Sequence, residues 1–203
     1  MGKIIIGIHG LGNKPSRKIL EGWWKQSIEE GLRKYTNYRE DFRFELVYWA
    51  DVFHEKPLNP LENDPENPLF MEEIYTPAPS DYISDPHIIR RKILDILEEQ
   101  LDKIFLNEDQ TVNFSFITDS IIRTYFKELD SYYAKECEDE EDATCRAKDV
   151  IRERTANVIK KYKDDEILII GHSMGSIIAY DVLTFTIPEL NIHTFLTMGS
   201  PLG

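Results

Sequence analysis

The chain has 203 residues, of which 41% are hydrophobic and 11% aromatic, a composition that excludes a disordered polypeptide and suits one globular domain. Its formal net charge of −13 disfavours binding to nucleic acid or to an anionic membrane surface. No apolar run approaches the length needed to cross a bilayer, so we expect no integral membrane segment.

The first predicted element is a buried parallel strand over residues 3–8. Its sequence, Lys-Ile-Ile-Ile-Gly-Ile, is apolar on both faces, as in a strand that helices cover from both sides. The run His9-Gly10-Leu11-Gly12 follows at once. Glycines in such a loop allow backbone N–H groups to turn toward a ligand, so we expect a binding loop at the end of this strand.

A helix and a second strand follow. Ser16 can cap a helix whose apolar residues recur at helical spacing as far as Leu32, and residues 42–49 have the pattern of a strand. A strand, a helix and a strand in this order begin a parallel sheet with a right-handed crossover. We therefore predict the α/β class, with a predominantly parallel sheet flanked by helices.

Residues 55–142 are predicted to be an insertion within a single domain that spans residues 1–203. Seven of the ten prolines fall between residues 55 and 86, where neither a helix nor a central strand can be sustained. Helical patterns resume after this loop, and the acidic run 136–142 is interpreted as a solvated connection between helices. The insertion starts at the edge where α/β sheets bind ligands, so it either caps the site or covers the sheet.

Two features indicate the compartment. The first apolar segment begins at residue 3, which leaves no room for a signal peptide. The only two cysteines, Cys137 and Cys145, lie in an acidic region, which favours reduced thiols over a disulfide framework. We therefore expect a cytoplasmic protein.

The most informative stretch is Gly171-His172-Ser173-Met174-Gly175, between a predicted buried strand at 166–170 and a predicted helix at 176–183. A turn this tight from strand to helix strains the backbone of its central serine, and larger side chains two residues to either side would collide. Glycines at both positions remove these collisions. The helix that follows directs its first N–H groups at the serine, where an oxyanion would form. The pattern therefore predicts a nucleophilic Ser173.

A third segment completes the pattern, because a strand at 192–198 ends in a Gly-Ser-Pro turn. Together the three segments resemble the α/β-hydrolase superfamily, in particular its lipase- and esterase-like serine hydrolases. The resemblance covers residues 3–14, about 42–51 and 148–203. It implies an enzyme that acts on a carboxylic ester or a related small acyl substrate, without a metal or a cofactor.

The resemblance also implies roles for individual residues. In the family's pattern Ser173 is the nucleophile, and the backbone N–H groups of Leu11 and Met174 form the oxyanion hole. His9 then braces the loop and does not act as the base. The other residues expected to support the site are Gly10, Gly12, Gly171, His172 and Gly175.

The sequence offers no suitable acid and base for Ser173. In α/β-hydrolases the acid and then the histidine follow the serine, and beyond Ser173 the chain holds only Asp181, Glu189 and His193. We expect His193 to begin its strand, about 13 Å from the edge where the serine lies, and Asp181 to point away from the site. The acid and histidine are therefore expected in strands beyond residue 203, which makes the chain the N-terminal part of a hydrolase.

Other assignments remain open. His54 and His87 border the insertion and are the alternative bases that could approach Ser173 from a cap. A non-catalytic α/β-hydrolase-like scaffold or binding protein also fits a chain that lacks an acid and a base. A nucleotide-binding module fits less well, because Asn13 separates Gly12 from Lys14 where a phosphate loop needs them adjacent.

Overall fold

A computed structural model of the chain describes residues 2–38, 40–78, 132 and 147–200. The chain divides into two compact units, residues 1–77 with 131–203 and residues 78–130. Apart from Ala78, every described residue belongs to the first unit. The helices predicted after the proline-rich loop, the acidic run and both cysteines lie outside the described residues.

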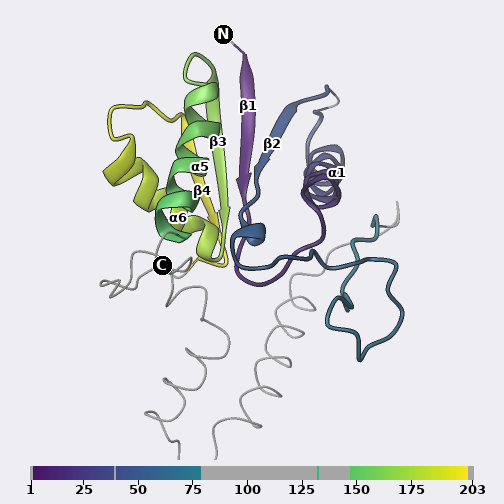
Figure 1. Ribbon diagram of the computed structural model, residues 1–203. Helices are drawn as coiled ribbons and strands as arrows, with labels where there is room; N and C mark the ends of the chain where they lie inside the picture. Colours follow the sequence, from purple (N-terminus) through teal and green to yellow (C-terminus); the bar gives the residue numbers. More distant parts are fainter. Residues whose placement is uncertain (1, 39, 79–131, 133–146, 201–203) are drawn as a thin grey trace, which may run out of the picture. The chain divides into compact units, whose positions relative to one another are not determined.

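Among the described residues, four parallel strands form one sheet with the order β2-β1-β3-β4 (Figure 1). β1 is one of the two inner strands and pairs with β2 on one side and β3 on the other. This inner position explains why its sequence is apolar on both faces. The strands are β1 (Lys3–Ile8), β2 (Arg43–Val47), β3 (Glu166–His172) and β4 (Thr194–Met198).

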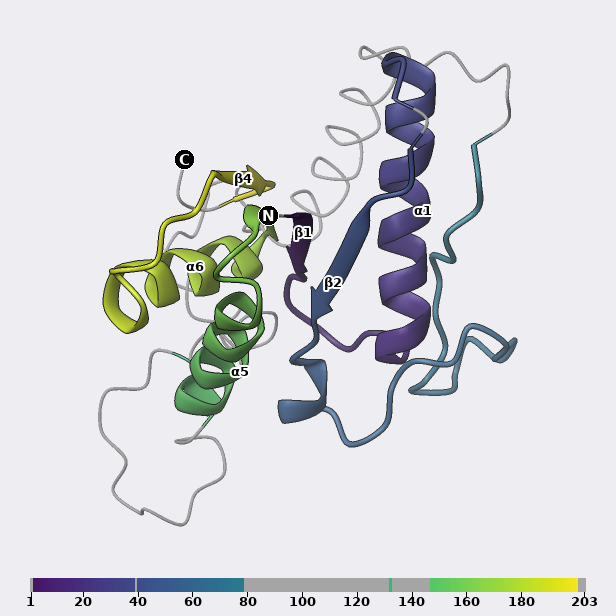
Figure 2. The same ribbon diagram turned by 90° about the horizontal axis from the view of Figure 1, so that it is seen from above.

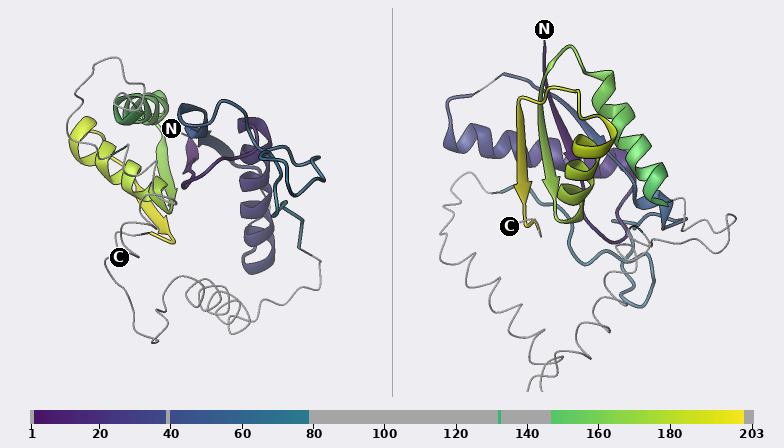
Figure 3. Two further views of the ribbon diagram at one scale, coloured as in Figure 1. Left: turned by 60° about the horizontal axis from the view of Figure 1, so that its bottom comes forward. Right: turned by 90° about the vertical axis from the view of Figure 1, so that its left-hand side faces the viewer.

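Helices cover both faces of this sheet. Helix α1 (Arg17–Tyr35) lies on one face, and α5 (Ala147–Lys161) and α6 (Met174–Asp181) lie on the other (Figures 2 and 3). A 3-10 helix, η1 (Ala50–Val52), follows β2, and a π-helix, η2 (Val182–Thr186), continues α6. The predicted α/β class, with a parallel sheet flanked by helices, is therefore confirmed.

Two local predictions can be compared with the observed elements. Ser16 precedes α1 as predicted, but its side chain makes no capping hydrogen bond, and its carbonyl oxygen accepts from the N–H groups of Ile19 and Leu20. The proline-rich loop forms no helix or regular strand between residues 55 and 78, and side chains organise it instead. For example, Asn67 donates from Nδ2 to Glu62 at 2.7 Å and accepts from the Leu69 N–H at 2.9 Å.

The core lies between the sheet and helices α5 and α6. Successive side chains of a strand face opposite sides, and Gly7 faces α1, because a methyl group there would lie 2.8 Å from the rings of Trp24 and Phe44. The isoleucines that alternate with Gly7 therefore face α5 and α6, together with their partners in register on β3. These side chains and those they meet on the helices are at most 3% exposed: Ile4, Ile6, Ile8, Ile151, Ile159, Ile167, Ile169 and Ile178. This layer holds the carboxyl ends of β1 and β3 side by side.

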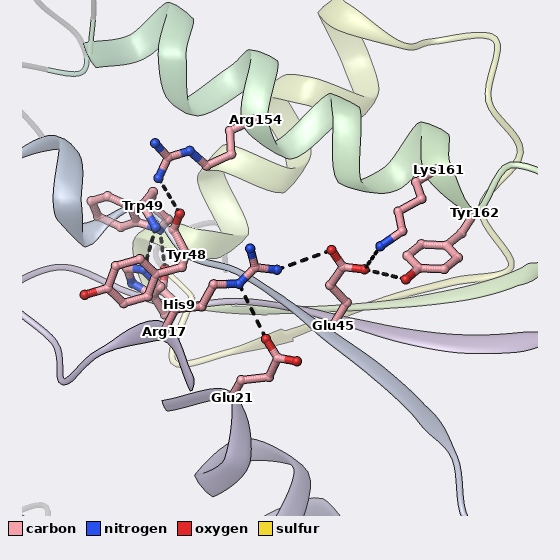
Figure 4. A network of polar contacts seen from close by, with 9 residues as sticks. All are labelled: His9, Arg17, Glu21, Glu45, Tyr48, Trp49, Arg154, Lys161 and Tyr162. Carbon is pink, nitrogen blue, oxygen red and sulfur yellow. Dashed lines mark hydrogen bonds and ion pairs between the residues drawn. The ribbon is translucent and has the colours of Figure 1, made fainter. Parts of the chain in front are cut away.

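Glu45 ties the edge strand β2 to helices on both faces of the sheet (Figure 4). Its carboxylate accepts hydrogen bonds from Lys161 Nζ at 2.7 Å and from the hydroxyl of Tyr162, and Arg17 Nη2 approaches it to 3.3 Å. The Glu45 side chain is only 13% exposed, so these partners replace water around the charge. The contacts fix β2 just before it leads into the residues that contact the site.

Candidate active site

The carboxyl ends of β1 and β3 form the point at which the strand order changes direction. From β1 the chain proceeds to β2 on one side of the sheet, and from β3 it proceeds to β4 on the other side. The loops after these two adjacent strands therefore lead to helices on opposite faces, α1 and α6. In open α/β sheets, ligands bind in the crevice at such a switch point.

Ser173 occupies this point with a strained backbone. Its φ is 51° and its ψ is −124°, and among the described residues it is the only non-glycine residue with a positive φ. Its N–H donates to the Met198 carbonyl oxygen at 2.8 Å, and its carbonyl oxygen accepts from the N–H and the hydroxyl of Ser176 at 3.0 Å and 2.5 Å. Such strain persists only where the surroundings determine the conformation, and it occurs most often at functional sites.

The strand-to-helix turn at residues 171–175, here called the elbow, has two glycines that are required by close packing. A methyl group at Gly175 would lie 2.1 Å from the carbonyl oxygen of Ile8 and 2.7 Å from that of His9. A methyl group at Gly171 would lie 2.6 Å from Ser176 Cα. Both collisions are with backbone atoms, which cannot move aside as a side chain can. The sequence predicts that larger residues would collide at these two positions, and the structure identifies the backbone atoms they would meet.

His9 is buried beneath the loop that follows β1. It is 1% exposed, and its imidazole stacks on the Trp49 ring with centroids 4.7 Å apart (Figure 4). The Trp49 N–H donates to Nε2 at 3.0 Å, so Nε2 is unprotonated and Nδ1 carries the proton, which it donates to the Gly10 carbonyl oxygen at 2.8 Å. Burial lowers the pKa of His9 to about 3, which keeps the ring neutral.

This arrangement orients the peptide group between Gly10 and Leu11. The His9 imidazole holds the carbonyl oxygen of that group, and in a trans peptide the N–H points in the opposite direction. The loop also touches Ser173, because a methyl group at Gly10 would lie 2.9 Å from Ser173 Cβ. Within the described part of the chain, no hydrogen bond uses the N–H of Leu11 or of Met174. Among the described residues, the N–H of Met174, which follows Ser173, and that of Leu11, which follows Gly10, are therefore uncommitted donors.

A mainly apolar cavity of about 460 Å³ opens beside the elbow on the α1 face of the sheet. His172 of β3 and Met198 of β4 belong to its wall. His172 precedes Ser173 in the chain, and the carbonyl oxygen of Met198 accepts the hydrogen bond from the Ser173 N–H. The sequence predicts that the proline-rich loop borders the pocket of Ser173, and residues of this loop do line the cavity. The remaining lining residues are Leu20, Trp23, Trp24, Ser27 and Ile28 of α1, Met71, Glu73, Ile74 and Tyr75 of the loop, and Ile170.

The residues rejected as triad partners lie away from Ser173. Asp181 accepts hydrogen bonds from the Tyr132 hydroxyl and from Arg152 Nε, both at 2.8 Å, and so is committed at the far end of α6. His193 precedes β4, where its Nδ1 lies 2.8 Å from Thr194 Oγ1 and its Nε2 lies 3.7 Å from Glu166. Glu189 is exposed in the connection before it.

The three remaining histidines are His54, His87 and His172. His54 follows η1 and does not line the cavity, and His87 lies outside the described residues. His172 is exposed at the end of β3, where partial burial and then the nearby Lys14 lower its pKa. No described histidine or carboxylate hydrogen-bonds to the Ser173 hydroxyl.

Within the described ranges, no group of three or more His, Cys, Asp and Glu side chains could hold a metal ion, and no helix is long and apolar enough to cross a membrane. No family model, curated protein or solved structure matches the chain.

Replacing Gly175 with alanine should destabilise the protein. The added methyl group would separate α6 from β1, and overpacking of this kind costs about 3 kcal/mol of unfolding free energy. Gly22→Ala is the matched control, because a methyl group at Gly22 meets nothing within 4 Å and alanine stabilises a helix by about 1 kcal/mol over glycine. Urea denaturation measures both changes. Equal effects of the two substitutions would contradict the packing argument.

His9 should make stability depend on pH between 5 and 7. The unfolded chain protonates His9 below about pH 6.5, whereas the folded protein keeps it neutral down to about pH 3. The free energy of unfolding is therefore highest at pH values above the unfolded-state pKa of about 6.5. It declines as the pH falls, by about 2 kcal/mol between pH 7 and pH 5. Denaturation at several pH values should show this loss in the unmodified protein and lack it in His9→Gln. His193→Gln, which removes an exposed histidine, is the control and should retain the loss.

Proposed function

We propose that this chain is an α/β-hydrolase-like serine hydrolase that acts on a carboxylic ester or a related acyl substrate. The observation that carries the proposal is the strained backbone of Ser173 at the switch point of the sheet, with a hydroxyl that no described group engages. A serine held at this cost, with its side chain uncommitted, is what nucleophilic catalysis requires.

In the proposed reaction, Ser173 Oγ bonds to the carbonyl carbon of the ester while its proton passes to a base. The carbonyl oxygen becomes an oxyanion, which accepts hydrogen bonds from the N–H groups of Leu11 and Met174. The carbon–oxygen bond to the alcohol then breaks, and the alcohol leaves with a proton from the protonated base. Water subsequently attacks the acyl-serine, releasing the acid and restoring the hydroxyl.

The cavity beside the elbow suggests where the apolar part of the substrate binds. Its wall is built mainly from aromatic and aliphatic side chains, and its one carboxylate is that of Glu73. Because His172 and Met198 belong to this wall and adjoin Ser173, an apolar chain in the cavity would lie next to the reacting ester. We therefore propose an ester with an apolar acyl or alkyl group.

A second candidate function is binding without turnover. It is favoured by the observation that no histidine or carboxylate in the described ranges hydrogen-bonds to the Ser173 hydroxyl. A hydrolase needs a base at this hydroxyl. The two candidates differ in whether Ser173 reacts with an electrophile.

Ser173 is expected to be the residue that reacts with a fluorophosphonate. The oxyanion-hole donors should stabilise the attack of its Oγ on phosphorus, and serine proteases stripped of their triad retain roughly 10³- to 10⁴-fold catalysis over water. Labelling under forcing conditions, followed by peptide mass mapping, should locate the adduct on Ser173. Ser173→Ala should abolish the adduct, whereas Ser27→Ala, which changes a serine in the cavity wall, should retain it. An adduct that survives Ser173→Ala would refute the assignment.

The rate of this labelling should rise with the length of the alkyl chain on the probe. Each methylene buried in the cavity contributes about 0.8 kcal/mol, or up to about fourfold in rate. A series of alkyl fluorophosphonates tests this on the unmodified protein. Ser27→Trp, which places an indole in the cavity, should remove the gain, and Lys18→Trp on an exposed part of α1 should not. A rate that is independent of chain length would exclude the cavity as the apolar subsite.

A further inference from the structure

Lys14 folds its side chain back over its own loop. Its Nζ donates to the carbonyl oxygen of Leu11, lies 3.2 Å from that of Gly12 and lies 3.4 Å from that of Asn13. Three consecutive carbonyl groups thus converge on one ammonium group. A lysine carries three donors on a compact charge, and this number matches the three acceptors.

The backbone of Lys14 is fixed independently of its side chain. Its N–H donates to Asn13 Oδ1 at 2.8 Å, and its carbonyl oxygen accepts from the Leu58 N–H at 2.9 Å. Asn13 Nδ2 in turn donates to the Lys56 carbonyl oxygen at 2.9 Å. The position of the Lys14 backbone therefore does not depend on the ammonium group. The contacts of the ammonium group instead constrain the preceding residues of the loop.

Convergence of the carbonyl groups determines where the N–H groups of the loop point. In trans peptides the C=O and N–H groups point in opposite directions, so the carbonyls of residues 11–13 that face Lys14 direct the N–H groups of residues 12–14 away from it. The Leu11 N–H belongs to the preceding peptide, whose carbonyl oxygen His9 holds. Gly12 makes the required reversal with a φ of 83°, a conformation that glycine adopts without strain. The same loop touches Ser173 at Gly10.

We propose that Lys14 is a positioning residue for the oxyanion hole: its ammonium group holds the carbonyl oxygen of Leu11, while His9 holds the preceding peptide that carries the Leu11 N–H, so that Leu11 is fixed on both sides for an anion that forms on Ser173. This inference rests on the proposed function. The ammonium group also places a positive charge behind the loop, and its field, after burial, lowers the pKa of His172 at the elbow.

The test compares Lys14→Met with Lys18→Met in the full chain. Lys14→Met retains an apolar stem and loses all three donors, and Lys18→Met removes the same charge from an exposed position on α1. The rate constant for fluorophosphonate labelling of Ser173 should fall roughly 10- to 100-fold in Lys14→Met, less than for deletion of an oxyanion donor, because the donor is displaced and not removed. The rate should be unchanged in Lys18→Met. Thermal unfolding should differ little among the three proteins, because the backbone of Lys14 has its own anchors.

Hydrogen exchange of the peptide spanning residues 9–15 provides a readout that does not require a reactive serine. Exchange there should be faster in Lys14→Met than in the unmodified protein, and it should be unaltered in Lys18→Met. Equal labelling rates in Lys14→Met and the unmodified protein would overturn the role of Lys14 while leaving the proposed function intact. An unmodified protein that does not label would refute the proposed function, and hydrogen exchange alone would then decide whether Lys14 orders the loop, with unchanged exchange overturning that role.

Discussion

At Gly175 the first turn of α6 packs against the backbone at the end of β1, with no side chain between them. The space is so small that a methyl group would lie 2.1 Å from the Ile8 carbonyl oxygen. Because α6 starts this close to β1, the chain has to turn from β3 into α6 within one residue, and Ser173 takes the strained conformation that results. Hydrogen bonds to Met198 and from Ser176 hold both of its peptide groups, so the strain cannot relax by rotation of either.

The position of the loop after β1 depends on a buried aromatic contact. Trp49 both stacks on His9 and donates to it, from the chain that leaves β2. The Trp49 indole N–H also donates to the His9 carbonyl oxygen at 3.0 Å, so backbone and ring are held together. A neutral imidazole is needed for this arrangement, because one ring nitrogen accepts while the other donates. The loop beside Ser173 is consequently positioned by β2, a strand that does not itself contact the serine.

The two faces of the sheet differ in a way that suits a reactive centre. Toward α5 and α6, a layer of isoleucines is almost completely buried and makes the elbow rigid. Toward α1, the cavity lies open beside the elbow, and Leu196 and Met198 of β4 are 43% and 49% exposed. Ser173 is thus fixed from one side, while the other side presents exposed apolar side chains. Under the proposed function, residues of the open face can alter the substrate preference without disturbing the serine.

The sequence by itself determined the strands, the parallel class and the elbow, because these follow from local patterns: apolar runs of strand length, a helix between them, and glycines two residues from Ser173. Only the tertiary structure decided what surrounds the elbow. Trp49, Lys14 and the cavity wall come from segments far apart in the chain, and the sequence suggests for Lys14 only the role of a phosphate-loop lysine. Their roles depend on which backbone atoms the fold brings within hydrogen-bonding distance, and no periodicity or spacing in the sequence encodes that.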